Sequence, residues 1–553
     1  MRYAVVLALL TAAFASAQQP YDLIIRGGRI VDGTGNAWFY GDVFVRGDRI
    51  ARIAPAGRSG TMQAKQIIDA KGMVVAPGFI DIQSHSRGAF LSGDGRVISK
   101  ITQGITTEIM GEGATNAPAN EKTKTLESTG REVLQDFSGP HGFRRWLEAM
   151  QSHGTSANFG SFVGATTMRM YGKGMAQGEV TDGEMKEMAA AMKEAMEDGA
   201  FGLASALIYP PGEYSSTREL IGLSKAMSPY GGVYITHMRS EADRLLEAID
   251  EAIEIGRKGG VPVEIYHLKA SGPVNWPKMA KALDKINGAR AAGLDISADM
   301  YSYTAGGTGL TACLPPNASA DGKLFDNLAD PAMRTKIRQE VLHQTTEWEN
   351  MCTLATPEGV LITQTVNPEN AAYTGKRLSE IAKMQNKHWL DAAMDLILSE
   401  HRRVETIYFM MSEDNIKAQL RQPWIKFGTD AAGLDPETAK GLAHPRSYGN
   451  YPRILGKYVR EEKVIPLEDA IRKMSSAVAT RLSIPDRGLI KEGMFADIVV
   501  FNPDTVGDLA TYEKPHQISV GIRDVLVNGQ LVVREGQHTG AKPGRMLLGP
   551  GAR

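Results

Sequence analysis

The hydrophobic positions between residues 233 and 299 change their spacing in a regular way. Short apolar runs that contain β-branched residues occupy 233–237, 263–267 and 295–300. Between the first two runs, apolar residues around Ile249 recur every three or four positions, the spacing of an amphipathic helix. The pattern predicts strand, helix, strand, helix, strand. It indicates a parallel sheet, because each crossover between parallel strands needs a helix to cover the sheet.

The same alternation extends over most of the chain. It predicts eight strands, at 79–85, 106–112, 158–164, 201–207, 233–237, 263–267, 295–300 and 424–430. Eight strands alternating with helices predict an α/β fold of the (β/α)8 barrel type over residues 77–483. No glycine fingerprint follows the first strand, which argues against a doubly wound dinucleotide-binding sheet.

A long segment separates the seventh predicted strand from the eighth. Residues 306–422 far exceed the handful of residues in an ordinary connection, so they predict an inserted subdomain or lid. The insert holds both cysteines of the chain, Cys313 and Cys352, so at most one internal disulfide can form. The sequence leaves open whether they pair.

The two ends of the chain have a different pattern. Short apolar runs in 18–76 are punctuated by glycines, which predicts a small antiparallel sheet. Apolar runs of the same character recur in 484–553. We therefore expect a small β-sandwich built from both termini, beside the central α/β body.

The composition narrows the classes of partner. The chain has 553 residues with 42% hydrophobic residues, enough for a large core and more than one domain. The 62 Lys and Arg residues balance 63 Asp and Glu residues, and no basic block stands out. We therefore expect neither nucleic acid nor a membrane as partner; the oligomeric state stays open.

The first residues predict export. Arg2 precedes an apolar run, and Ala15, Ser16 and Ala17 form a small-residue cleavage site. Residues 1–17 are too short to span a bilayer and have the form of a secretory signal peptide. We expect cleavage near Ala17 and a periplasmic or secreted mature protein.

Five residues near the ends of predicted strands could form one metal site. His237 and His267 end adjacent strands, and the carboxyl ends of parallel strands meet on one rim of a barrel. His85 and Glu112 end the first two strands, and Asp430 ends the eighth. Imidazole nitrogen with carboxylate oxygen is a ligand set for zinc and similar divalent ions. A metal there would activate water for hydrolysis, with Asp430 as general base and acid.

Each of these residues also has a structural interpretation. A single histidine in a strand is more often a hydrogen-bonded core residue than a ligand, and an aspartate at a strand end is a routine helix cap. Two histidines that end adjacent strands favour the metal interpretation. Glu108 competes with Glu112 for the ligand role, because both lie on the same face of the second strand.

Several stretches resemble one known family. The chain contains APGFIDIQSH, TQGITTEIMGEG, YITHMRSEADRLLEAIDEAIEIG, YHLKASG, SADMYSYTAGGTGL, IKFGTDAAG and HPRSYGNYPRILGKYVREE, in this order. These motifs resemble the D-aminoacylase (N-acyl-D-amino-acid deacylase) branch of the amidohydrolase superfamily. The resemblance implies a (β/α)8 barrel with a terminal β-sandwich, one or two zinc ions, and hydrolysis of N-acyl amino acids, which we expect to be of D configuration.

The resemblance also implies roles for individual residues. His237 and His267 would bind the tightly held zinc ion, and Asp430 would be the catalytic aspartate. Lys269 and Tyr301 would hold the carboxylate of the substrate. Two further residues would line the substrate pocket, Tyr209 and Arg446; the forked side chain of Arg446 suits a carboxylate.

Three positions depart from the family pattern. Gln83 stands where the family has the first histidine of a His-x-His pair, and an amide is a poor zinc ligand, so one metal ion is favoured over two. Glu112 stands in the place of a ligand cysteine, if one residue is deleted from the family pattern. A carboxylate is a harder ligand than a thiolate, so Mn²⁺ or Co²⁺ could compete with Zn²⁺. Gly307 stands where a serine near the substrate carboxylate is expected.

Two alternatives remain open at this stage. A dipeptidase or cyclic-amide hydrolase would use the same zinc chemistry on the same barrel, and a panel of dipeptides would reveal it. A non-catalytic binding protein with a degraded metal site would lack stoichiometric transition metal.

Overall fold

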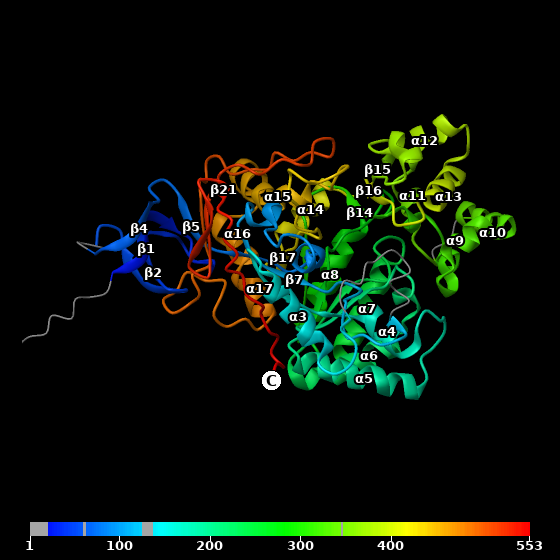
Figure 1. Cartoon of the computed structure of the whole chain (residues 1–553), viewed down its shortest axis with the longest axis horizontal. Helices are drawn as coiled ribbons and strands as arrows, with labels where there is room; N and C mark the ends of the chain where they lie inside the picture. The colour runs from blue at the N-terminus through cyan, green and yellow to red at the C-terminus, as the bar shows by residue number, and fades with distance from the viewer. Residues whose placement is uncertain (1–19, 59–61, 124–135, 344–346) are drawn as a thin grey trace, which may run out of the picture.

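The computed structural model describes residues 20–58, 62–123, 136–343 and 347–553 (Figure 1). The predicted signal peptide, residues 1–17, lies outside this set. Among the described residues, no helix combines the length and the apolar character that a membrane span requires.

The eight predicted strands are present and follow one another in parallel. The strands are β6 (Phe79–Asp81), β7 (Ile105–Met110), β8 (Asn158–Ser161), β9 (Val163–Gly164), β10 (Gly202–Ala206), β11 (Val233–His237), β12 (Val263–Ile265), β13 (Ile296–Met300) and β17 (Ile425–Phe427). The third predicted strand is divided into β8, which pairs with β7, and β9, which pairs with β10. Beyond β17 the chain returns to the segment after β6, where Ser84 and Ala431 form a parallel bridge. Successive strands are therefore neighbours within two sheets, β6 to β8 and β9 to β17, and the segments that follow the first and the last strand meet at this bridge.

Helices alternate with these strands along the chain, and several pack against them. They are α1 (Arg87–Leu91), α2 (Ile98–Ile101), α3 (Gly142–His153), α4 (Ala165–Lys173), α5 (Asp182–Glu197), α6 (Thr217–Met227), α7 (Leu245–Gly259), α8 (Lys278–Ala291), α14 (Glu413–Leu420), α15 (Arg446–Arg453), α16 (Leu467–Met474) and α17 (Ser476–Arg481). Helix α5 begins with a capping box, in which the Thr181 side chain accepts from the Glu184 backbone and the Glu184 side chain accepts from the Thr181 backbone. Helix α7 buries the predicted apolar stripe around Ile249 and ends at Gly260, whose φ of +68° is favourable for glycine.

Strands from both ends of the chain share one nine-stranded sheet, shown in blue and red in Figure 1. The strands are β1 (Tyr21–Ile30), β2 (Phe39–Arg46), β3 (Arg49–Pro55), β4 (Ala64–Asp69), β5 (Val74–Pro77), β18 (Ile498–Phe501), β19 (Ile522–Val527), β20 (Gln530–Arg534) and β21 (Gln537–His538). N-terminal β5 pairs with C-terminal β18, which joins the two halves. The predicted antiparallel N-terminal sheet is antiparallel from β1 to β3, but β1 pairs in parallel with β4 and β5. The two-layer sandwich stays a prediction.

The last residues leave this sheet, contrary to the predicted boundary of 484–553. The backbone amide of Gly544 donates to the Thr155 carbonyl, and that of Leu547 donates to the Phe159 carbonyl in β8 at 2.6 Å. Further along, the Gly549 amide donates to the Gly199 carbonyl. The tail therefore lies against the amino-terminal ends of β8 and β10.

The insert forms a separate body with its own core (Figure 1, green to yellow). Its sheet has the order β14 (Gly306–Gly309), β16 (Glu405–Tyr408), β15 (Val360–Gln364), and its helices are α9 (Leu324–Ala329), α10 (Pro331–Leu342), α11 (Met351–Leu354), α12 (Leu378–Gln385) and α13 (Trp389–Glu400). A disulfide joins Cys313 and Cys352. The predicted boundary at 422 is too late, because Ile416 and Leu420 of α14 already pack in the core of the central body.

Candidate metal centre and substrate pocket

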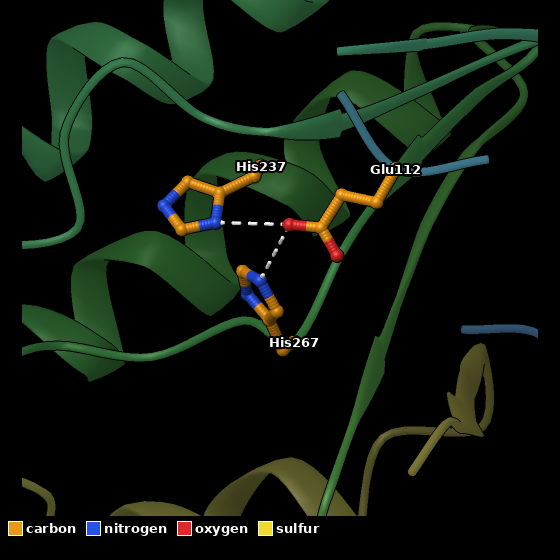
Figure 2. Close-up of side chains that lie close together, drawn as sticks. All are labelled: Glu112, His237 and His267. Atoms are coloured by element: carbon orange, nitrogen blue, oxygen red, sulfur yellow. Dashed lines mark hydrogen bonds and ion pairs between the residues drawn. The ribbon is translucent and has the colours of Figure 1, made fainter. Parts of the chain in front are cut away.

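Glu112 lies between two groups of metal-ligand side chains. Its Oε1 atom is 3.2 Å from His237 Nδ1 and 3.5 Å from His267 Nε2, and Figure 2 shows both rings turned toward this carboxylate. Its Oε2 atom is 3.4 Å from His85 Nε2. Two overlapping groups result, Glu112 with His237 and His267, and Glu112 with His85 and Asp430, each with its ligand atoms within 4.8 Å of one another.

The ends of the strands determine where these side chains point. His237 is the last residue of β11, and His267 follows β12. His267 and Asp430 have φ angles of +32° and +49°, a left-handed backbone that costs of order 1–3 kcal/mol in a non-glycine residue. Hydrogen bonds hold both: the His267 amide donates to Asp299 Oδ1, and the Asp430 amide donates to the Gln83 carbonyl, each at 2.9 Å. The fold therefore maintains this strain at the rim where the two groups meet.

Asp430 connects the second group to a buried arginine. Its Oδ1 is 2.9 Å from His85 Nε2, and its Oδ2 is 2.7 Å from Arg446 Nη1. Burial alone raises the pKa of Asp430, but the charge of Arg446 and the hydrogen bond with His85 lower it to about 2. Asp430 is therefore a carboxylate at neutral pH, able to accept a proton.

The residues present fit a divalent cation. His237 Nε2 and Gln83 Oε1 are buried and have no hydrogen-bond partner in the described parts of the chain. Burial and the charge of Lys269 lower the pKa of His267, but Glu241 and Glu112 outweigh them and raise it to about 10. The carboxylates thus attract positive charge to the imidazoles, and a cation bound by neutral imidazoles would satisfy the same carboxylates.

Glu112, and not Glu108, lies among the histidines. Two serine hydroxyls donate to Glu108 at 2.5 Å each, and Lys100 Nζ is 3.4 Å away. Lys100 also pairs with Asp81 at 2.6 Å, and the side chains of all three are fully buried. Burial raises the pKa of Glu108. Glu108 thus belongs to a closed network beneath the metal-ligand groups.

Gln83 lies beside the groups and belongs to neither. Its Nε2 donates to Glu112 Oε2 at 2.5 Å. This hydrogen bond fixes the amide so that its Oε1, which is buried without a partner among the described residues, is the only atom of Gln83 that could contact a cation. That Gln83 is a poor ligand stays a prediction.

The four predicted pocket residues surround these groups. Lys269 Nζ is 2.7 Å from His267 Nδ1, so this lysine touches a predicted ligand directly. The Arg446 guanidinium lies 4.6 Å from the centre of the Tyr301 ring, and its Nη2 donates to the Gly307 carbonyl at 3.4 Å. Tyr209, the last of the four, packs edge to face against a predicted ligand: the centre of its ring lies 5.4 Å from that of His237.

Two glutamates at this site were missed by the sequence analysis. Glu241, in the loop after β11, is 1% exposed and lies 3.0 Å from His267 Nδ1. Glu349, in the insert, accepts a hydrogen bond from Ser240 in that loop. Neither residue ends a strand or repeats at a helical spacing, so no periodic signal marks them.

The chain is similar to known proteins over nearly its full length. Residues 346–533 match the model of an amidohydrolase family. The chain is 34% identical to a D-aminoacylase of Alcaligenes xylosoxydans xylosoxydans over 536 residues, which cover 96% of this chain and 98% of the relative.

Two solved structures share the whole fold. One is N-acyl-D-glutamate deacylase from Bordetella bronchiseptica complexed with zinc and a phosphonate inhibitor, with a TM-score of 0.80 at 30% identity. The other is a D-aminoacylase studied for its binuclear metal centre, with a TM-score of 0.78 at 31% identity. Each alignment covers 96% of this chain and 100% of the other. By sequence over nearly its full length, and by fold, this chain belongs to the D-aminoacylase family of amidohydrolases.

Proposed function

We propose that this protein is a metal-dependent hydrolase that cleaves the amide bond of N-acyl-D-amino acids. The observation that carries the proposal is the position of Glu112 between His237, His267 and the pair of His85 and Asp430. The sequence relatives support it, since they are a D-aminoacylase and deacylases of N-acyl-D-glutamate and N-acyl-D-aspartate.

The proposed chemistry divides between a cation and the side chains. A bound divalent cation supplies Lewis acidity and lowers the pKa of water to ~7. Asp430 takes a proton from the attacking water and gives it to the leaving amino group, so that the acyl carbon gains the hydroxyl and the nitrogen leaves as an amine. Arg446 favours the ionised form of Asp430 through its charge.

The pocket residues suit an amino-acid carboxylate. Tyr301 and Arg446 lie together, and a hydroxyl and a guanidinium are both donors that a carboxylate accepts from. We assign Lys269 to the same carboxylate; its ammonium has three donors, so it can keep Glu241 and still bind the substrate. Tyr209 packs against His237, and we assign it to the acyl group.

We propose one zinc ion, held by Glu112, His237 and His267. Beside the second group, Gln83 donates to Glu112 and can offer only a neutral amide oxygen, a weak ligand for zinc. Carboxylate in place of thiolate makes the ligand set harder, so Mn²⁺ and Co²⁺ are the alternatives to Zn²⁺.

We further propose a (β/α)8 barrel as the scaffold, with the insert as a lid beside the rim. The parallel order of the strands and the bridge between Ser84 and Ala431 support closure. We also propose export, either to the periplasm or out of the cell. The disulfide between Cys313 and Cys352 supports an oxidising compartment.

Purified protein should hydrolyse N-acetyl-D-amino acids and leave the L enantiomers largely intact. Chelation should abolish the activity, and one equivalent of Zn²⁺ per chain should restore it. A dipeptide panel and a cyclic-amide panel run in parallel would reveal the two related activities. Hydrolysis that persists after metal has been removed to below a tenth of an equivalent would overturn the proposal.

A further inference from the structure

We propose that Glu241 is a positioning residue: it fixes the tautomer of the metal ligand His267 and the place of Lys269, and Glu349 of the insert holds Glu241 there. The inference rests on the metal-ligand role proposed above for His267. It adds a residue to the site that acts through its neighbours.

Three nitrogens converge on the Glu241 carboxylate. Its Oε1 lies 3.0 Å from His267 Nδ1 and 2.7 Å from Lys269 Nζ, and its Oε2 lies 3.6 Å from His237 Nε2. The side chain is 1% exposed, so water does not screen these contacts.

The tautomer of His267 depends on this contact. Nε2 of His267 faces Glu112, so it can bind a cation only if it carries no proton, and a neutral imidazole must then carry its proton on Nδ1. That proton needs an acceptor. Two groups compete for Nδ1: Lys269 Nζ lies at hydrogen-bond distance, 2.7 Å, and Glu241 Oε1 lies 3.0 Å away. Lys269 has only donors, so of the two only Glu241 can accept the Nδ1 proton. Without the carboxylate, Lys269 would donate to Nδ1 and favour the proton on Nε2, where it competes with the metal.

The loop that carries Glu241 is held on both sides. The Ser271 amide, after β12, donates to the Glu241 carbonyl at 2.7 Å. From the insert, Glu349 Oε1 accepts from the backbone amides of Glu241 and Ala242 and from the Ser240 hydroxyl. A single oxygen of the insert thus collects three donors of this loop.

Glu349 connects this loop to the insert. It lies two positions before α11, the helix that contains the disulfide-bonded Cys352. The orientation of the imidazole therefore depends on a side chain from a different structural body. Loss of the Glu349 oxygens should loosen the loop while the Glu241 carboxylate itself remains.

The first experiment measures zinc affinity without any substrate. The metal-free protein and its variants are titrated with Zn²⁺ against a chromophoric chelator, and the Co²⁺ absorption spectrum reports the ligand geometry. We expect Glu241→Gln to weaken Zn²⁺ binding about 10- to 100-fold, the usual cost of losing the partner of a ligand histidine. Wild-type affinity together with an unchanged Co²⁺ spectrum in this variant would overturn the role of Glu241.

The second experiment tests the insert and does not require the first variant to fold. Glu349→Ala removes all acceptor oxygens and should weaken Zn²⁺ binding and lower kcat several-fold, whereas Glu349→Gln keeps an acceptor and should restore both. Glu358→Ala is the matched control, because Glu358 also belongs to the insert and has an exposed side chain. Equal Zn²⁺ affinity in Glu349→Ala and Glu358→Ala would overturn the coupling to the insert.

These readouts separate two kinds of failure. If the wild-type protein binds zinc but hydrolyses no N-acyl amino acid, the proposed function fails, while the affinity series still tests Glu241. If the wild-type protein hydrolyses the substrate and Glu241→Gln keeps both zinc affinity and kcat, the positioning role alone fails. A merely structural role would lower the melting temperature and leave the Zn²⁺ affinity of the folded fraction unchanged.

Discussion

Glu112 and Asp430 place negative charge on two sides of a small group of imidazoles, and His85 contacts both carboxylates. The two metal-ligand groups share Glu112 and differ in their other members. Changes to those other members should therefore affect one group and not the other.

Replacing Asp430 with asparagine should remove the proton acceptor and leave the ligands Glu112, His237 and His267 in place. We expect kcat to fall about 10²- to 10⁴-fold, the range for loss of general acid–base catalysis. Elemental analysis should still find one metal ion per chain. Glu437→Gln, an exposed position in the loop after Asp430, should retain full activity. Near-normal kcat in Asp430→Asn would contradict the assigned role.

Replacing Gln83 with histidine should create a second metal position. The amide nitrogen that now donates to Glu112 would give way to an imidazole nitrogen that can bind a cation beside His85 and Asp430. We expect the metal content after dialysis to rise from one to two ions per chain. A content that stays at one would show that another feature of the second group limits its occupancy.

At the scale of elements, the sequence identifies the strands and the residues that end them. Period-two and helical spacing are local signals, so His237 at the end of β11 and Asp430 after β17 could be found without coordinates. Glu241 and Glu349 could not, because their contacts join a loop to an insert more than a hundred residues away. The residues next to Glu241 and Glu349 in sequence do not indicate this contact, because any polar residue in a loop would give the same local pattern.

The docking of the insert should depend on pH through Glu349. Burial, followed by the charge of Glu241, raises the pKa of Glu349 from 4.5 to about 7. A raised pKa means that the folded state binds the proton more tightly than the unfolded state, so this group lowers stability as the pH rises from about 4.5 to about 7. Thermal unfolding of the wild type and of Glu349→Gln across this range should show the wild type losing stability relative to the variant. A difference in melting temperature that stays constant with pH would contradict the expected titration.

The disulfide should matter mainly to the insert. Cys313 and Cys352 are 39 residues apart, and closing a loop of this length restricts the unfolded chain by about 4 kcal/mol. We expect Cys313→Ser with Cys352→Ser to lower the free energy of unfolding by up to this amount, measured in a denaturant titration. Reduction of the wild type should reproduce the loss, and reduction should leave the double variant unchanged.

At the scale of the whole molecule, the tail that follows β21 supports the end of the strands away from the metal-ligand groups. Its contacts are to Phe159 and Gly199, near the starts of β8 and β10, whereas His237 and His267 follow the carboxyl ends of β11 and β12. The apolar pattern of the sequence does not predict this position. The tail pairs with β8 through an isolated bridge to Phe159 and not through a strand of its own, so it shows no period-two pattern.

Deletion of residues 544–553 should therefore affect stability far more than chemistry. We expect a lower melting temperature, because the amides and carbonyls of β8 lose their partners, and nearly unchanged kcat for the fraction that remains folded. Active-site titration with a tight-binding inhibitor would give that fraction. A large fall in kcat per folded molecule would show that the tail also shapes the rim.

The tail also constrains the order in which the chain can fold. The Arg545 amide donates to Asn158 Oδ1, 387 positions earlier in the chain. β8 therefore cannot gain this partner until most of the chain has been synthesised. Contacts between residues so distant in sequence make folding slow. Until the tail is in place, this edge of β8 lacks its hydrogen-bond partners, and an unpaired strand edge can pair with another chain.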